Sequence, residues 1–279
     1  MNSDALSNQI INGIKSIGIN PTFKNPIATH EPFFQGTNAT SYVNDCINSG
    51  WVSSTGKWVN KFEDEICKFT GAKHCIAVNN GTAALRLALH ASGVKNNDEV
   101  IIPPLSFVAT SNAVSHLGAY PHFVDIEKDT YGMSPEALAT RLEKIVSFKD
   151  GKLINKLTGR RISAVIAVHV FGNPANTYSL LDITSKWNLT LIEDAAEALG
   201  SWNKRKTNSE RIHCGLIGDI GIFSFNGNKI ITTGGGGAII TNESYKAKLI
   251  RHLSTTAKQP HPWAFFHDQM AWNDRMPNL

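Results

Sequence analysis

Lys229 stands at a position where its amine can react. An alternating apolar stretch, Ile220–Phe225, predicts a strand, and the turn Asn226-Gly227-Asn228 leads from it to the lysine. Four glycines follow at 234–237, and glycine lets the backbone come close to a ligand. A lysine among apolar neighbours can lose its proton and attack a carbonyl carbon. The same residues also fit a hairpin whose turn exposes a lysine, so both interpretations stay open at this point.

The stretch Asn79–Leu85, NNGTAAL, indicates a place for a phosphate group. Here an apolar strand ends, a glycine turns the chain, and a helix begins at Thr82 and Ala83. The first amides of a helix have no partner within the helix and attract an anion. The ordinary alternative is a capped helix that binds no ligand.

Carboxylates end another predicted strand. Glu193 and Asp194 follow the apolar pair Leu191-Ile192, and Glu197 comes three residues after Asp194. In parallel α/β sheets, ligands bind at the carboxyl ends of the strands. A carboxylate there can hold a protonated ring nitrogen or a metal ion, whereas helix capping is the ordinary interpretation of Asp194 alone.

Phe107 follows a third predicted strand and can stack on a flat ring, although it fits the core equally well. Taken together, the chain offers a phosphate seat, an aromatic cover, a carboxylate and an amine, all at strand ends. A phosphorylated pyridine aldehyde needs this set, because its phosphate is anchored, its ring covered, its ring nitrogen kept protonated and its aldehyde held by an amine. The joint occurrence favours pyridoxal phosphate as the cofactor.

The elements that must position these residues alternate between strand and helix. This order predicts an α/β fold with a largely parallel sheet, interrupted by a polar insertion at 148–161. Two further helices are expected at 39–48 and 57–69, and the apolar positions of residues 4–17 predict a small N-terminal helix. The predicted strands are 75–78, 99–102, 120–124, 163–168 and 190–193, and the helices between or after them are 82–91, 106–117, 134–146 and 177–187.

Composition excludes several classes of function. The 279 residues are 42% hydrophobic and 18% charged, which suits one large domain and at most part of a second. The net charge of +4 comes without a long basic block, so we expect no nucleic acid partner. The four cysteines lack metal-type spacing, and we expect no metal and a reducing, cytoplasmic location. The N-terminus lacks a signal pattern, and the best apolar run, 162–170, is too short for a membrane span.

Several motifs together resemble the DegT-type nucleotide-sugar aminotransferases, which are pyridoxal phosphate enzymes of the aspartate aminotransferase fold. The similarity runs from about Trp51 to the last residue, and the branch that it most resembles aminates 4-keto-6-deoxy sugars on UDP, in bacillosamine- or legionaminic-type pathways. The motifs are NNGTAALRLAL, EDAAEALGS, GDIGIFSFNGNKIITTGGGGAI, HLSTTAK and NDRMPNL.

The resemblance assigns a role to each matching residue. Lys229 is implied to hold the coenzyme as a Schiff base, and Asp194 to pair with the pyridine nitrogen. Glu197 is implied to face the ring or its phenolic oxygen, and Phe107 to cover the ring. The residues implied to bind the phosphate are Thr82, Ala83 and Ser224.

Asn273 is implied to reach the phosphate in the neighbouring subunit's site, so a homodimer with shared active sites is expected. The family more often has Gly-Tyr-Asn-Tyr there, whereas this chain has Ala271-Trp272-Asn273-Asp274.

The resemblance also divides the chain. It implies an N-terminal helix and extended arm over 1–36, a coenzyme-binding large domain of fold type I over 37–254, and the start of a C-terminal segment over 255–279. Family members continue into a small C-terminal subdomain that helps to form the substrate cleft. Because this chain stops at Leu279 within a motif, we expect it to be truncated, with that subdomain largely missing.

The implied reaction is a transamination in two half-reactions. L-glutamate gives its amino group to the coenzyme, and the aminated coenzyme converts a nucleotide-linked 4-keto sugar to the 4-amino sugar. Two alternatives remain. Related sugar dehydratases carry histidine in place of the lysine, so Lys229 argues against them, and a non-catalytic homologue would bind only the coenzyme or a nucleotide sugar. The sugar, the nucleotide and the stereochemistry stay open.

Overall fold

The computed structural model describes residues 3–18, 31–204 and 211–279. It divides into two compact units, residues 1–33 and 34–279. The first unit holds helix α1 (Ser3–Ser16), which confirms the helix predicted at 4–17. Most of the arm predicted up to residue 36 lies outside the described residues, and the predicted boundary at 36 stays a prediction.

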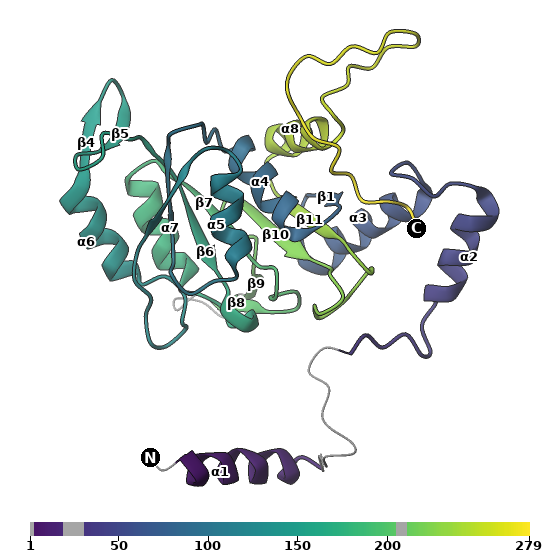
Figure 1. Ribbon diagram of the computed structural model, residues 1–279, viewed down its shortest axis with the longest axis horizontal. Coiled ribbons are helices and arrows are strands. Elements are labelled where there is room, and N and C mark those ends of the chain that lie inside the picture. The colour runs from purple at the N-terminus through teal and green to yellow at the C-terminus, as the bar shows by residue number, and fades with distance from the viewer. Residues whose placement is uncertain (1–2, 19–30, 205–210) are drawn as a thin grey trace. The chain divides into compact units, whose positions relative to one another are not determined.

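The second unit is built on a seven-stranded sheet in the order β1-β11-β10-β7-β6-β2-β3 (Figure 1). The strands from β10 to β3 run parallel, and β11 pairs antiparallel with both β10 and β1. The predicted α/β fold with a mostly parallel sheet is therefore confirmed. The strands are β1 (His74–Val78), β2 (Glu99–Ile102), β3 (Tyr120–Phe123), β6 (Ile162–Val168), β7 (Thr190–Asp194), β10 (Ile220–Ser224) and β11 (Gly237–Thr241).

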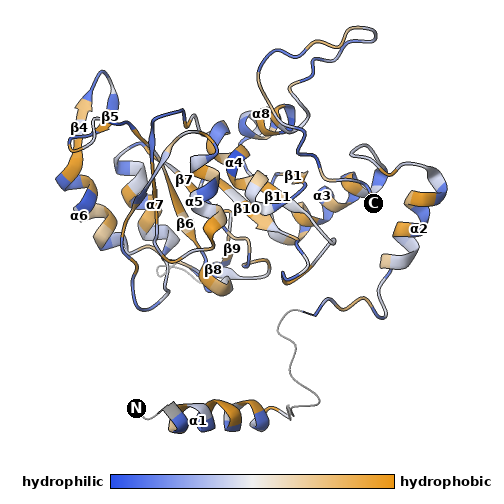
Figure 2. Ribbon diagram, in the orientation of Figure 1, coloured by the Kyte–Doolittle hydropathy of each residue, from blue (hydrophilic) through white to orange (hydrophobic). Residues whose placement is uncertain are grey.

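Helices cover both faces of this sheet because side chains alternate along each strand. Val100 and Ile102 of β2 pack in a cluster with α4, α5 and α8, whereas Ile101 between them packs with α6 and α7. Figure 2 shows the hydrophobic strands in the middle of these layers. The helices are α2 (Ala39–Ser49), α3 (Lys57–Thr70), α4 (Gly81–Ala91), α5 (Val108–Ser115), α6 (Pro135–Ile145), α7 (Thr177–Lys186) and α8 (Ser244–Ser254), with the short 3₁₀ turn η1 (Val170–Gly172).

Two hairpins lie outside the main sheet: β4 (Val146–Lys149) with β5 (Lys152–Asn155), and β8 (Trp202–Lys204) with β9 (Arg211–His213). The first occupies the polar insertion predicted at 148–161. Glu99 ties it to the sheet, since its carboxylate accepts hydrogen bonds from Asn155 Nδ2 at 2.7 Å and from Thr158 Oγ1 at 2.5 Å.

The last residues of the chain pack against the start of α3. Asn278 Oδ1 accepts the backbone amides of Trp58 at 2.9 Å and Val59 at 3.2 Å. The residue before α3, Gly56, makes no side-chain cap, and a Cβ there would lie 2.3 Å from Asn278 Cγ. Asn278 therefore caps this helix from 220 residues away in the sequence. In the part of the chain that the structure describes, no helix is long and apolar enough to cross a membrane.

Candidate active site

A cavity of about 480 Å³ opens at the carboxyl ends of β6, β7 and β10. A cavity of this size is within the range for a small-molecule ligand. It brings together six of the residues named from the sequence, which come from four different parts of the chain. They are Thr82, Phe107, Asp194, Glu197, Ser224 and Lys229.

Lys229 lies in the turn that follows β10, where its amide bonds to the carbonyl of Asn226 at 3.0 Å. Its side chain is only 12% exposed. The Nζ atom donates to Glu197 Oε1 at 2.7 Å and lies 5.9 Å from the centre of the Phe107 ring. The turn therefore aims the amine into the cavity between a carboxylate and an aromatic ring.

Asp194, the last residue of β7, has a nearly buried side chain. Its Oδ2 accepts the hydroxyl of Thr110 at 2.8 Å, and its Oδ1 accepts the amide of Ala196 at 3.3 Å. Burial raises the pKa of Asp194, and the Thr110 hydrogen bond opposes that rise. Sequence reasoning missed Thr110, although it lies one helical turn beyond Phe107 in the predicted helix at 106–117.

The start of α4 forms the other end of the cavity. Close backbone packing places it there: a Cβ on Gly81 would lie 3.0 Å from Ser224 Cβ, and one on Gly237 would lie 2.5 Å from the Asn80 carbonyl carbon. Thr82 and Ser224 both line the cavity here. Two hydroxyls at a helix N-terminus suit a phosphate group.

Ala83, which was expected to bind the phosphate, is not among the residues that line the cavity. Its amide donates to Asn80 Oδ1 at 2.8 Å, so Asn80 caps α4 and occupies the donor that was expected to meet the phosphate. The phosphate contact of Ala83 stays a prediction.

Asn273 lies apart from this cavity, in an exposed position where it forms a bridge with Thr255. Its expected role concerns a neighbouring subunit, and that role also stays a prediction.

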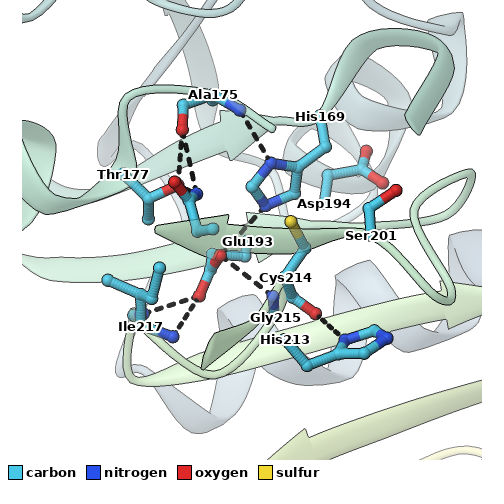
Figure 3. A network of polar contacts seen from close by, with 12 residues as sticks. His169, Ala175, Thr177, Glu193, Asp194, Ser201, His213, Cys214, Gly215 and Ile217 are labelled. Carbon is cyan, nitrogen blue, oxygen red and sulfur yellow. Dashed lines mark hydrogen bonds and ion pairs between the residues drawn. The ribbon is translucent and has the colours of Figure 1, made fainter. Parts of the chain in front are cut away.

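Glu193 points away from the cavity, because neighbouring residues of a strand face opposite sides. Figure 3 shows its buried carboxylate accepting bonds from His169 and from the loop at 213–218. The backbone donors are Gly215 at 2.9 Å, Ile217 at 2.7 Å and Gly218 at 2.6 Å. Burial acts to raise the pKa of Glu193, but these hydrogen bonds outweigh it and the pKa is lowered.

His169 is neutral in this network. The Ala175 amide donates to Nδ1 at 3.0 Å, so Nδ1 carries no proton, and Nε2–H donates to Glu193 Oε2 at 2.9 Å. Glu193 and His169 thus hold together the ends of β6 and β7 at the cavity, whose lining includes His169.

Phe171 is a further cavity residue that the sequence did not reveal. It follows β6, is 88% exposed, and adopts φ 51° and ψ 28°, a left-handed conformation that is uncommon for an aromatic residue. The next residue, Gly172, has φ 78°, and a Cβ there would lie 2.5 Å from the carbonyl oxygen of Glu197. Tight packing against the 194–201 segment therefore holds the loop in this shape.

Comparison with known proteins identifies the family. The model of the DegT/DnrJ/EryC1/StrS aminotransferase family matches residues 35–279, and the chain belongs to this family. The family resemblance and the fold type inferred from the sequence are confirmed. Aminotransferases of this family depend on pyridoxal phosphate, so the predicted cofactor is confirmed at the level of the family.

Three similar proteins illustrate the relationship. GDP-perosamine synthase of Vibrio cholerae is 37% identical over 91% of this chain and 62% of its own length. A putative pyridoxal phosphate-dependent aminotransferase of Bacillus subtilis, EpsN, is 37% identical over 85% of this chain and 57% of its own. The crystal structure of DesI with its TDP-sugar product superposes with a TM-score of 0.75 at 27% identity, covering 96% of this chain and 62% of that one. The chain therefore spans about three fifths of the length of these relatives.

Proposed function

We propose that this protein transfers an amino group from L-glutamate to the 4-keto carbon of a nucleotide-linked 4-keto-6-deoxy sugar, with pyridoxal phosphate as cofactor. The observation that carries the proposal is the placement of the Lys229 amine, 12% exposed, in one cavity with the buried carboxylate of Asp194. The proposed working form is a cytoplasmic homodimer, and the free state of all four cysteines supports a reducing location.

The cavity residues fit this cofactor. Thr82 and Ser224 would hold its phosphate at the start of α4, where Gly81 lets the two elements meet. Asp194 would bind the protonated ring nitrogen, and Phe107 would cover the ring. When bound, pyridoxal phosphate supplies an aldehyde for the amine and a cationic ring that withdraws electrons from the reacting carbon.

Lys229 and its neighbours would perform the proton transfers. As a free amine, Lys229 Nζ would take a proton from the reacting carbon of the substrate and return it nearby. Glu197, 2.7 Å from Nζ, would keep the amine oriented during this exchange. A positioned base of this kind accelerates proton transfer by roughly 10²–10⁴-fold.

The names of similar proteins support a nucleotide-linked sugar as the acceptor. One relative is a GDP-perosamine synthase, and the structure of DesI was determined in the presence of its TDP-sugar product. The two names carry different nucleotides, so the proposal leaves the nucleotide open. The presence of Lys229, where the related dehydratases carry histidine, favours transamination over dehydration.

The test begins with the donor half-reaction. Purified protein loaded with pyridoxal phosphate should convert L-glutamate to 2-oxoglutarate in a single turnover, and Lys229→Ala should abolish this conversion. Borohydride reduction followed by peptide mapping should place the cofactor on Lys229. The control is Lys246→Ala. Lys246 is another largely buried lysine, which lies on α8 and pairs with Asp219 and Glu243.

The outcome separates the competing functions. A non-catalytic homologue would bind the cofactor or a nucleotide sugar yet release no 2-oxoglutarate. A label on another lysine, with Lys229 unmodified, would contradict the proposed site. A panel of UDP-, GDP- and dTDP-linked 4-keto sugars would then identify the acceptor.

A further inference from the structure

Thr110 has a hydroxyl group that is buried beside the carboxylate of Asp194. It lies in the first turn of α5, where its amide bonds to the carbonyl of Phe107 at 3.1 Å. The residue is 0% exposed, and Oγ1 lies 2.8 Å from Asp194 Oδ2. The helix that begins beside the aromatic cover of the cavity thus also carries a donor to its buried carboxylate.

The hydrogen-bond geometry defines the charge state that this contact favours. The Thr110 hydroxyl has one hydrogen, and Asp194 Oδ2 accepts it, while Oδ1 accepts the amide of Ala196. A carboxyl group whose two oxygens both accept bonds is suited to the ionised form. Each oxygen keeps a further lone pair, and Asp194 lines the cavity, so the carboxylate can still accept a hydrogen from a ligand.

We propose that Thr110 is a positioning residue that holds the Asp194 carboxylate ionised and aimed at the cavity, ready to accept the ring N–H of pyridoxal phosphate. The proposal rests on the function proposed above and deepens it. It assigns Thr110 no contact with the cofactor, because the hydroxyl acts through Asp194.

Burial explains why Asp194 needs this donor. Burial raises the pKa of Asp194, and the Thr110 bond is the largest effect that opposes it. The other titratable groups facing Asp194 are Lys229, from the turn after β10, and His169, from the end of β6. Lys229 forms an ion pair with Glu197 at 2.7 Å, and His169 is neutral. Neither group therefore takes over the effect of the Thr110 hydroxyl on Asp194.

A matched pair of substitutions tests the proposal. Thr110→Val keeps the shape and removes the hydroxyl, and Thr110→Ser keeps the hydroxyl. Cofactor affinity is measured by absorbance titration with pyridoxal phosphate between pH 5 and 8.5. We expect Thr110→Val to weaken binding about tenfold, the scale of a hydrogen bond to a charged group. As the pH is lowered, the cofactor affinity of Thr110→Val should begin to fall at a higher pH than that of the wild type. The reason is that Asp194 takes up a proton more readily when the Thr110 hydroxyl is missing.

Two controls separate positioning from general damage. Thr70→Val removes another buried hydroxyl, which donates to the Ile66 carbonyl at 2.7 Å on α3, and it should leave cofactor affinity and its pH dependence unchanged. In an Asp194→Asn background, Thr110→Val should cause no further loss of affinity, because the two residues act as one unit. Thr110→Ser should restore most of the affinity.

Each outcome decides the matter. Wild-type affinity and pH dependence in Thr110→Val would overturn the proposal, as would a folded Thr110→Ser that binds as poorly as Thr110→Val. An additive loss in the Asp194→Asn background would also overturn it. If the wild-type protein binds the cofactor on Lys229 but the Thr110 variants give one of these contrary results, the role proposed for Thr110 is wrong and the proposed function still stands. If the wild-type protein binds no cofactor, the proposed function fails with it.

Discussion

Replacing the single residue Asp194 tests whether its buried carboxylate acts through its charge. Asp194→Asn should still bind pyridoxal phosphate, more weakly, while the single-turnover rate with L-glutamate falls by roughly 10²-fold or more, as when an electrostatic partner of a transition state is removed. An amide cannot stabilise a protonated ring nitrogen by charge. Rapid-scan absorbance with L-glutamate measures the rate. Near-normal turnover would mean that Asp194 merely forms the turn to Ala196.

The residues that could be predicted from the sequence share one property. Lys229 and Asp194 lie at or just beyond strand ends, and a parallel sheet gathers such ends at one edge, whereas Ser224 was implied only by the family resemblance. Thr110 and Phe171 gave no comparable signal. Thr110 contacts Asp194, which is 84 positions away in the sequence. The position of Phe171 depends on a left-handed backbone conformation that no local sequence pattern encodes.

At the scale of the element, the loop after β6 stores backbone strain at Phe171. A left-handed conformation costs a non-glycine residue roughly 1–2 kcal/mol, whereas glycine adopts it freely but loses about 0.5–1 kcal/mol through added entropy of the unfolded chain. Phe171→Gly should therefore leave the free energy of unfolding unchanged or raise it by up to about 1 kcal/mol. Urea denaturation followed by circular dichroism measures the difference.

The control for this prediction is Phe148→Gly. Phe148 is also exposed, at 71%, but it lies in strand β4, where glycine weakens the element. This control should be destabilised. If Phe171→Gly were destabilised to the same extent, the Phe171 ring would have to contribute packing energy that its exposure does not suggest.

The hairpin of β4 and β5 shows how an element escaped prediction. Its strands, VSFK and KLIN, are only four residues long, so each is too short to give a clear alternating pattern within the insertion at 148–161. The turn itself carried a signal: Asp150 and Gly151 have φ 50° and φ 70°, as the two-residue turns that favour Asp-Gly require. Central strands such as β2 and β6 were predictable because burial on both faces makes them largely apolar, whereas the edge strand β3 is partly exposed.

At the scale of the whole molecule, Glu193 joins the ends of two strands and a loop. Glu193→Gln should lower the free energy of unfolding by roughly 2–4 kcal/mol at pH 7, because the amide turns its NH₂ group toward backbone donors that need an acceptor. The folded-state pKa of Glu193 is lowered, so its stabilisation is present above the unfolded pKa and is lost as the pH falls through the folded pKa.

Urea unfolding at several pH values tests this sign. The difference between wild type and Glu193→Gln should be largest near pH 7 and should shrink below the ordinary glutamate pKa of 4.5. Glu65→Gln is the matched control, since Glu65 pairs with Lys68 at the surface and should change stability little at any pH. A difference that stays constant with pH would show that shape, and not charge, is what Glu193 provides.

Asn278 joins the last residues of the chain to α3 and gives the final prediction. Its side chain accepts two amides at the start of the helix, and its Nδ2 donates to the Trp51 carbonyl at 2.6 Å. Asn278→Ala should lower the free energy of unfolding by about 1–3 kcal/mol, because three buried or half-buried groups lose their partner. The control is Asn242→Ala, whose single bond to the Lys73 amide at 3.1 Å is exposed, so a smaller loss is expected. Urea denaturation compares the two variants. A loss of stability in Asn278→Ala that is equal to or smaller than that in Asn242→Ala would mean that water satisfies the first turn of α3 without Asn278.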